Sequence, residues 1–153
     1  CNSGSYGTEK GLKSCLPCQP GRASSKVGLT SACDECIVGQ FQRRNGSAEC
    51  FKCIPGQYQS AVGQAECLEC ALNTYTDTVE QDACLVCAAG KYTVTNGSST
   101  CLSCVAGRFG ERFGGNCRDC PVGWFRATED LNVSRCVQCE KGETTQTTAS
   151  SGC

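Results

Sequence analysis

The sequence of 153 residues contains no histidine and few residues that could form an ordinary hydrophobic core. Without histidine, the chain lacks the commonest general base and the commonest zinc ligand other than thiolate. Leu, Ile, Val and Phe together number 25, about 16% of the chain, a level typical of disordered sequences when nothing else holds them together. The composition therefore excludes a histidine-based active site and a fold that depends on apolar burial alone.

Other classes of protein are excluded by what else is missing. The net charge is -1, from 14 basic and 15 acidic residues, so we expect no nucleic acid as a partner. No apolar run approaches the roughly 18 residues that cross a bilayer, so we expect no membrane span in this chain. There is no segment with a basic start and an apolar centre, so we expect any secretion signal to lie outside this sequence.

Cysteine is the residue that the sequence has in excess. Eighteen of the 153 residues are cysteine, about 12%, well above the level that marks a disulfide scaffold. Disulfide bonds stabilise extracellular domains whose apolar cores are too small. We predict an extracellular protein in which all eighteen cysteines form disulfide bonds: Cys1, Cys15, Cys18, Cys33, Cys36, Cys50, Cys53, Cys67, Cys70, Cys84, Cys87, Cys101, Cys104, Cys117, Cys120, Cys136, Cys139 and Cys153.

The cysteines divide the chain into nine modules of about 17 residues. Eight Cys-x-x-Cys pairs lie between Cys1 and Cys153, and the second cysteine of each pair begins a new module. We call this residue the opening cysteine, and the next cysteine along the chain the closing cysteine. A fixed period of this length is the signature of a repeat architecture. We predict a single tandem array with modules at about 1–17, 18–35, 36–52, 53–69, 70–86, 87–103, 104–119, 120–138 and 139–153.

Three further features recur at fixed distances from the opening cysteine. Three residues after it stands glycine, with Asn73 as the exception, and these residue types tolerate a positive φ or a close backbone approach. The first position inside Cys-x-x-Cys is apolar in six of the eight pairs. Five residues after the opening cysteine stands an aromatic residue in seven modules, and we expect its ring to stack on the disulfide and the Leu or Val of the neighbouring module. These aromatic residues are Tyr6, Phe41, Tyr58, Tyr75, Tyr92, Phe109 and Phe125.

The middle of each module carries turn residues. Asn45-Gly46 and Asn96-Gly97 are strong hairpin dipeptides, and the flanks at 57–59 and 92–95 alternate with the period of a strand. We predict a short two-stranded finger in each module and no helix longer than a turn. The predicted fold class is a small disulfide-rich protein, a linear solenoid-like rod of about nine short β-hairpin repeats.

The spacing of the cysteines favours one pairing over the others. If each opening cysteine bonds its closing cysteine, all eighteen are used, whereas pairing within each Cys-x-x-Cys leaves Cys1 and Cys153 without partners. An interlocked scheme stays open, although it leaves partners missing at the ends. Zinc bound by two Cys-x-x-Cys pairs would leave the same two cysteines unused, and a redox role requires a βαβ context. We therefore expect neither a metal nor a cofactor.

Three acceptor sequences for N-glycosylation occur, at Asn45, Asn96 and Asn132. They lie five, five and four residues before the closing cysteine, near the predicted tip of the finger, where a sugar could project into solvent. We expect N-glycans there. The serine- and threonine-rich run from Thr144 to Ser151 is either an acceptor region for O-linked sugar or a plain polar surface, and the sequence leaves both open.

The repeated string Cys-x-x-Cys-x-x-Gly-x-Tyr/Phe, as at 50–58 and 101–109, resembles the ephrin-receptor-like cysteine-rich repeat. It is more distantly similar to the modules of tumour-necrosis-factor receptors and to furin-like regions. The resemblance covers essentially the whole chain and implies extracellular, disulfide-bonded, rod-like segments without implying one activity. The chain departs from the pattern at Ala23 and Thr144 in the aromatic position, at Asn73, and in the longer loop from Cys120 to Cys136.

We expect a non-catalytic, secreted or cell-surface structural protein, a glycosylated spacer or filament segment that associates end to end with further copies. Catalysis is disfavoured because the chain has no histidine, no carboxylate pair at defined spacing and no loop outside the repeat. The alternative is the stalk of a receptor ectodomain that binds a protein ligand along its side. An exposed aromatic patch outside the repeat positions would favour it, and the candidates are Phe113 and Trp124, next to Arg108 and Arg112. Trp124 follows Gly123 and is equally well explained as one more packing aromatic.

Overall fold

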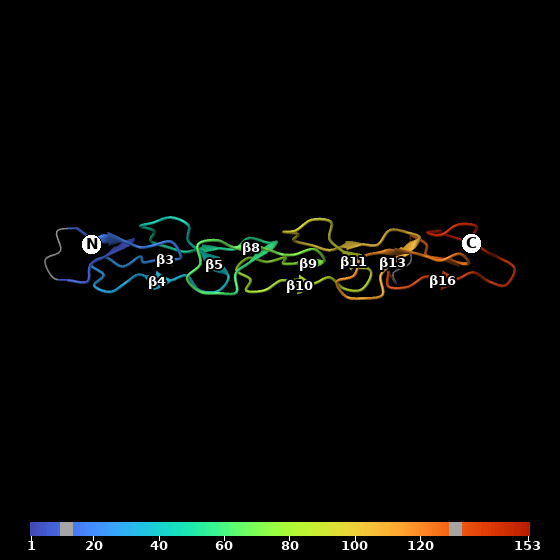
Figure 1. The fold of residues 1–153 in the computed structure, drawn as a ribbon, viewed down its shortest axis with the longest axis horizontal. Coiled ribbons are helices and arrows are strands. Elements are labelled where there is room, and N and C mark those ends of the chain that lie inside the picture. The colour runs from blue at the N-terminus through green and yellow to red at the C-terminus, as the bar shows by residue number, and fades with distance from the viewer. Residues whose placement is uncertain (10–13, 129–132) are drawn as a thin grey trace. The chain divides into compact units, whose positions relative to one another are not determined.

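The computed structural model describes residues 1–9, 14–128 and 133–153. These residues form sixteen two-residue strands and no helix, and the strands pair as eight antiparallel hairpins (Figure 1). This arrangement confirms the predicted class of a small disulfide-rich protein built of β-hairpin repeats. The strands are β1 (Ser5–Tyr6), β2 (Leu16–Pro17), β3 (Arg22–Ala23), β4 (Asp34–Glu35), β5 (Gln40–Phe41), β6 (Phe51–Lys52), β7 (Gln57–Tyr58), β8 (Leu68–Glu69), β9 (Thr74–Tyr75), β10 (Leu85–Val86), β11 (Lys91–Tyr92), β12 (Leu102–Ser103), β13 (Arg108–Phe109), β14 (Arg118–Asp119), β15 (Trp124–Phe125) and β16 (Val137–Gln138).

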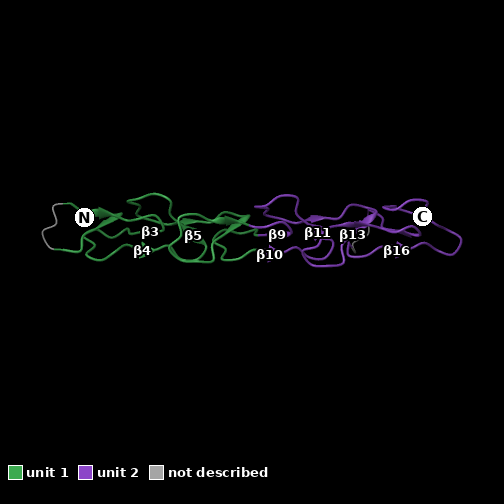
Figure 2. Ribbon diagram, in the orientation of Figure 1, with its two compact units in different colours: residues 1–69, 76–84 green, residues 70–75, 85–153 purple. Residues whose placement is uncertain are grey.

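The described residues fall into two compact units (Figure 2). The first contains Cys1–Glu69 and Thr76–Cys84, and the second contains Cys70–Tyr75 and Leu85–Cys153. Within each unit the chain repeats one set of contacts from module to module.

Each hairpin joins the aromatic strand of a module to the Cys-x-x-Cys segment that follows. The aromatic residue is the cross-strand partner of the apolar residue in that segment, as for Tyr58 and Leu68. In β5–β6 the rings of Phe41 and Phe51 lie 6.1 Å apart between centroids. Cross-strand pairs of this kind contribute about 0.2–1 kcal/mol each. The aromatic residue therefore meets its apolar partner within its own hairpin, which corrects the expectation that the partner belongs to the neighbouring module.

Eight disulfide bonds close the modules. Each joins an opening cysteine to the next cysteine along the chain, with Cα atoms 5.4–5.9 Å apart, the ordinary separation for a disulfide. Cys70 and Cys84 are disulfide-bonded as well. The bonds are Cys1–Cys15, Cys18–Cys33, Cys36–Cys50, Cys53–Cys67, Cys87–Cys101, Cys104–Cys117, Cys120–Cys136 and Cys139–Cys153.

The interior of each module is made of sulfur and polar side chains instead of aliphatic ones. The residue six positions after the opening cysteine, which we call the core polar position, is buried in seven modules although its side chain is polar. The apolar residues of the Cys-x-x-Cys segments are half exposed, and Phe51 is 59% exposed. The buried residues at the core polar position are Ser24, Gln42, Gln59, Thr76, Thr93, Arg126 and Thr145.

The core polar position satisfies the backbone of the loop that follows it. The side-chain amide of Gln59 donates to the carbonyl of Glu66 at 2.7 Å, and its oxygen accepts the Ala61 N–H at 3.1 Å. Gln42 makes the equivalent two hydrogen bonds to Glu49 and Arg44. A buried polar group without a partner is unfavourable, so these paired side chains fix the path of the loop.

Arg126 fills the same position in another way. Its buried guanidinium donates hydrogen bonds to the carbonyls of Cys104, Val105 and Arg108 in the preceding module. The core polar position therefore contributes to contacts within a module or between modules, depending on the side chain it carries.

Backbone hydrogen bonds join consecutive modules in both units. The residue three after the opening cysteine donates its N–H to the core polar residue of the next module, as from Gly21 to the Gln42 carbonyl and from Gly107 to the Arg126 carbonyl, at 2.7 and 2.8 Å. Where the core polar residue of the next module is threonine, its side-chain oxygen accepts the hydrogen bond, as from Gly123 N–H to Thr145 Oγ1. Contacts between neighbouring modules thus replace a common core, as in other repeat proteins.

We expect Gln59→Leu to destabilise its module by about 1–3 kcal/mol, because the Glu66 carbonyl and the Ala61 N–H lose their partners in a site that excludes water. Hydrogen exchange of the Ala61 amide measures the loss. Gln19→Leu is the matched control, since Gln19 is exposed and, among the described residues, contributes its backbone carbonyl alone, to Arg22 N–H. Equal exchange rates in the two variants would contradict the role of the core polar position.

Candidate functional site

In the seven modules whose tip the structure describes, the loop contains a turn that docks on the module before it. The turn residue is ten positions after the opening cysteine, has a positive φ, and is called here the tip residue. Its N–H donates to the carbonyl of the preceding opening cysteine, as from Gly46 to Cys18 and from Gly63 to Cys36. The described tip residues are Gly28, Gly46, Gly63, Glu80, Gly97, Gly114 and Ala149.

The carbonyl of the tip residue faces a glycine that belongs to the module two positions earlier. This glycine stands three residues after the opening cysteine of that module. A Cβ added to Gly4, Gly21 or Gly107 would lie less than 3.0 Å from the tip carbonyl of Gly46, Gly63 or Ala149, respectively. Gly39 faces Glu80 in the same way, and the longer loop of module 8 still presents a carbonyl, that of Val133, to Gly90. We call this arrangement the glycine socket.

The glycine socket gives the predicted glycine pattern its physical cause. Each of these glycines has a positive φ, and no side chain fits between its Cα and the docked carbonyl. Both readings of the pattern, the left-handed backbone and the close approach, are therefore confirmed. The exception, Asn73, has φ 63° and holds its neighbours through its side chain. Its amide nitrogen donates to Asn116 Oδ1 at 3.0 Å, and its amide oxygen accepts the Thr93 N–H at 3.2 Å.

Two sockets differ from the rest. A Cβ added to Gly123 or Gly142 would meet nothing within 4 Å in the described residues, although both glycines have a positive φ. Gly142 is exposed, whereas Gly4, Gly21 and Gly39 are buried under the docked loops. The N–H of Gly142 has no acceptor among the described residues. Among the described residues, no tip carbonyl faces these two glycines.

One tip residue also docks through its side chain. The carboxylate of Glu80 pairs with Lys52 Nζ at 2.5 Å and accepts a hydrogen bond from the Gln40 side chain. Gln40 and Lys52 are cross-strand partners in β5–β6, so one hairpin supplies both donors. The hydrogen bond and charge of Lys52, followed by the hydrogen bond of Gln40, lower the pKa of Glu80. Glu66 pairs with Arg43 in addition, so two of the five acidic residues between Cys53 and Gly90 form ion pairs.

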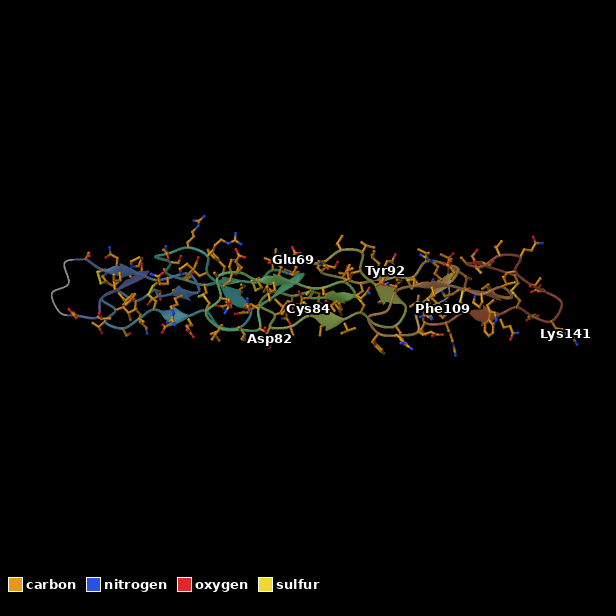
Figure 3. The ribbon with its side chains drawn as sticks, viewed as in Figure 1. Glu69, Asp82, Cys84, Tyr92, Phe109 and Lys141 are labelled. Carbon is orange, nitrogen blue, oxygen red and sulfur yellow. A yellow bond between two sulfur atoms is a disulfide. The ribbon has the colours of Figure 1, made fainter. Side chains whose placement is uncertain are left out.

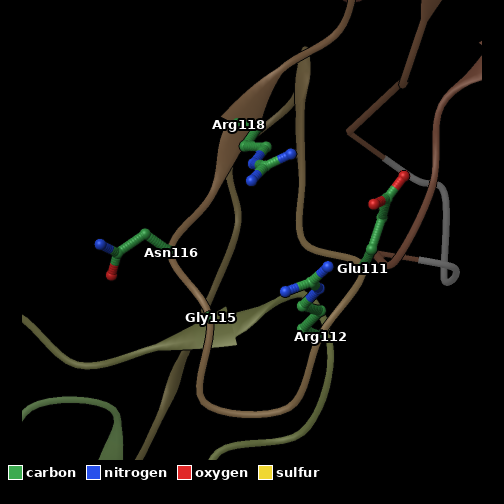
Figure 4. A pocket seen from close by; sticks show the side chains of 5 residues that line it. All are labelled: Glu111, Arg112, Gly115, Asn116 and Arg118. Carbon is green, nitrogen blue, oxygen red and sulfur yellow. The ribbon is translucent and has the colours of Figure 1, made fainter.

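A hollow of about 280 Å³ lies on the loop of module 7, lined by Glu111, Arg112, Gly115, Asn116 and Arg118 (Figure 4). Arg112 and Arg118 point toward one another across it, and neither has an ion-pair partner among the described residues. Arg118 stands where six of the other seven Cys-x-x-Cys pairs carry an apolar residue, opposite Phe109 in the β13–β14 hairpin. Two converging guanidinium groups are suited to a carboxylate or sulfate group.

A second hollow, of about 230 Å³, contains Trp124, one of the two aromatic residues predicted to contact a ligand. It is lined by Phe109, Glu111, Pro121, Trp124, Arg135 and Cys136, and Trp124 is 38% exposed. Phe113 is more exposed, at 74%, but lines neither hollow. Of the predicted ligand-contact residues, Trp124 and Arg112 thus lie in hollows that share Glu111. Arg108 pairs with Asp119 at 2.6 Å instead.

The comparison with protein families supports the pattern of these modules. Residues 39–80 match the model described as Tyrosine-protein kinase ephrin type A/B receptor-like. A search of curated proteins found no match. The matched segment and the modules around it share one organisation, a module of about 17 residues closed by one disulfide bond. The chain is an array of disulfide-bonded repeats, and residues 39–80 are similar to the ephrin-receptor-like module. Modules of this type are non-catalytic extracellular domains of receptors, which agrees with the high disulfide content.

The array presents two of the three predicted glycosylation sites on its surface. Asn45 and Asn96 are exposed in equivalent turns, each directly before a tip glycine. Asn132 lies outside the described residues. Charged side chains such as Lys141 project outward from the ribbon (Figure 3). No helix of the described residues is long and apolar enough to cross a membrane.

The burial of the core polar position was not predicted from the sequence, although a signal for it was present. The residue after each aromatic position is Ser, Gln, Thr or Arg in seven modules and glycine at Gly7 and Gly110. A position that never carries an aliphatic residue in nine repeats indicates a constraint. Polar residues in loops ordinarily indicate solvent exposure, so the constraint was not recognised as burial.

Glu80 gives the array a contact that depends on pH. Because its pKa in the folded chain lies below the ordinary value of 4.5, the contact stabilises the docked tip above about pH 4.5 and is lost as the pH falls through the lowered pKa. We expect the Glu80 amide, which donates to the Cys53 carbonyl, to lose protection from hydrogen exchange between pH 7 and pH 3 relative to the Gly46 amide. Glu80→Gln should remove this difference. A ratio that stays constant in the unmodified array would show that the carboxylate does not hold the tip.

Proposed function

We propose that the array is a non-catalytic spacer of a secreted or cell-surface glycoprotein and that it associates end to end with further copies of itself. The observation that supports this proposal is that one backbone contact, a tip carbonyl against a glycine two modules earlier, recurs along the chain. A contact that joins modules of one chain can also join modules of two identical chains. In this proposal the Gly142 socket receives a tip residue of a second copy.

The complementary group is the tip of module 2. Gly28 is exposed, and a Cβ added to it would meet nothing within 4 Å. Its N–H donates to the Cys1 carbonyl, so its turn has the geometry of the docked tips. The carbonyl of Gly28 in a second copy would lie against Gly142 as the Gly46 carbonyl lies against Gly4.

A contact of this kind joins two different surfaces of identical chains. Such heterologous association produces an open filament unless rotation closes it into a ring. Both surfaces are rigid turns held by backbone hydrogen bonds, so their association requires little reordering of the chain. Unpaired backbone N–H groups such as that of Gly142 also resemble the exposed edge of a sheet, which readily pairs with another chain.

We expect Gly142→Ala to abolish concentration-dependent association, because the added methyl group occupies the position of the incoming carbonyl. Sedimentation velocity of the secreted, oxidised protein over a range of concentrations measures the association. Gly152→Ala is the control, since Gly152 lies in the same module, has open space around it and does not have a positive φ.

Alanine at a positive φ also adds local strain of about 1–2 kcal/mol, so a second measurement uses the unmodified chain. The Gly142 amide should become protected from hydrogen exchange as concentration rises, while the Gly152 amide should not. Association that persists in Gly142→Ala, with no protection of Gly142, would place the contact on another surface. A chain that stays monomeric at all concentrations would reject self-association and leave the spacer function standing.

A second candidate function, a receptor stalk that binds a protein ligand, is favoured by the two hollows that share Glu111. Their lining combines arginine with tryptophan and phenylalanine, the residue types enriched at binding hot spots. A ligand with a carboxylate beside an apolar group would match them. Arg118→Glu distinguishes the two functions, since it should abolish binding of such a ligand and leave end-to-end association unchanged.

A further inference from the structure

Asn45 and Asn96 occupy the same place in two modules. Each lies nine residues after its opening cysteine, is exposed, and precedes a tip glycine with φ 70°. The serine of each acceptor sequence is also placed alike. Ser47 Oγ donates to the Arg44 carbonyl at 3.1 Å, and Ser98 Oγ donates to the Thr95 carbonyl at 2.7 Å. The backbone around the two asparagines therefore has one conformation in both modules.

A hollow lies in each of these loops, and a residue next to the asparagine in sequence lines it, Arg44 in module 3 and Gly97 in module 6. The hollow of module 3 measures about 240 Å³ and that of module 6 about 300 Å³. Counted from the opening cysteine, both are lined by the residues at positions 6, 11, 12, 13 and 15, so they are the same feature of the repeat. The lining residues are Gln42, Arg44, Ser47, Ala48, Glu49 and Phe51 in module 3, and Thr93, Val94, Gly97, Ser98, Ser99, Thr100 and Leu102 in module 6.

The two hollows combine polar groups with an exposed apolar side chain. In module 3, Ser47 and Glu49 offer polar groups, while Phe51 is 59% exposed. In module 6, hydroxyl groups surround the hollow and Leu102 is 50% exposed. A sugar ring has the matching character, since its hydroxyl and acetamido groups form hydrogen bonds and its C–H faces pack on apolar surface. A hollow lined by both kinds of group suits a single pyranose ring.

The hollow of module 3 exists before any sugar arrives. Gln42 is buried and holds the Glu49 carbonyl at 2.6 Å and the Arg44 N–H at 3.0 Å. The tip is held by the bond from Gly46 N–H to the Cys18 carbonyl. A preformed site needs little ordering of the protein on binding, and a sugar attached at Asn45 is already confined beside it.

We infer that the first N-acetylglucosamine of a glycan on Asn45 and on Asn96 lies in the hollow of its own module and covers Phe51 and Leu102. The glycan is then part of the module's surface and slows the local opening of its loop. This inference rests on the extracellular, glycosylated state proposed above. The occupant is the chain's own sugar because the attachment point and the hollow recur together in two modules separated by three repeats.

The experiment compares three forms of the secreted protein. The first carries high-mannose glycans, the second is trimmed by endoglycosidase H to a single N-acetylglucosamine, and the third is the variant Asn45→Gln/Asn96→Gln. Intact mass gives the occupancy of each. Nuclear Overhauser effects between the N-acetyl methyl group and the Phe51 ring or the Leu102 methyl groups report contact, and exchange of the Arg44 amide reports local opening. The loop of module 4 carries no acceptor sequence, so we expect no contact effect between an N-acetyl methyl group and Tyr58, and Tyr58 serves as the internal reference.

We expect the contact effects in the trimmed form and Arg44 exchange that is about threefold to tenfold slower in both glycosylated forms than in the variant, as for a local opening that the sugar opposes. Phe51→Ala should remove the difference between trimmed and unglycosylated protein, whereas Leu68→Ala in module 4 should not. Sugar that is attached but shows neither contact nor slower exchange would overturn the inference and leave the spacer function intact. Contact effects that depend on concentration would assign the hollow to a second copy. Absence of sugar at both asparagines would overturn this inference and the proposed glycosylation together.

Discussion

The structure depends on one backbone contact, the docking of a tip carbonyl against a glycine two modules earlier. With few aliphatic residues, the chain cannot hold its loops by apolar burial, and a disulfide closes a loop without deciding where the loop lies. The glycine socket decides it. Gly4, Gly21, Gly39 and Gly107 each receive a carbonyl that any side chain would exclude. The hydrogen bond from the tip N–H to an opening cysteine then fixes the same loop from its other side.

In this arrangement the exposed side chains are not needed to hold the fold together. The interior is occupied by disulfides and by the core polar residues, which pair with backbone groups of their own module or of the module before. Phe51, Leu102 and similar side chains can therefore remain half exposed, and charged residues can vary between repeats. Function in such an array belongs to the loops and hairpin faces where a module departs from its neighbours. The arginines of module 7 and the acceptor asparagines of modules 3 and 6 are departures of that kind.

The same contact also links the fold to the proposed assembly. Modules that join through two recurring surfaces offer the same surfaces to a second copy, as proposed for Gly142 and Gly28. The stability of the array and its association with another copy then depend on one geometry. Asn73 keeps the positive φ of the glycine position but has a side chain there, and its hydrogen bond to Asn116 replaces the close approach that a glycine allows.

The sequence by itself determined the repeat, the disulfide-rich hairpin class and the family resemblance, because cysteine spacing and the Gly-x-Tyr/Phe string are local in the chain. It also indicated the special backbone of the glycine position, since positive φ is a property of single residues. Only the tertiary structure decided that Gln42 and Gln59 are buried, because burial depends on which loop lies above them. It likewise decided that Tyr58 pairs with Leu68 within one hairpin. It also decided that the carbonyl of Gly46 lies against Gly4, 42 positions earlier in the sequence, a contact that no local pattern specifies.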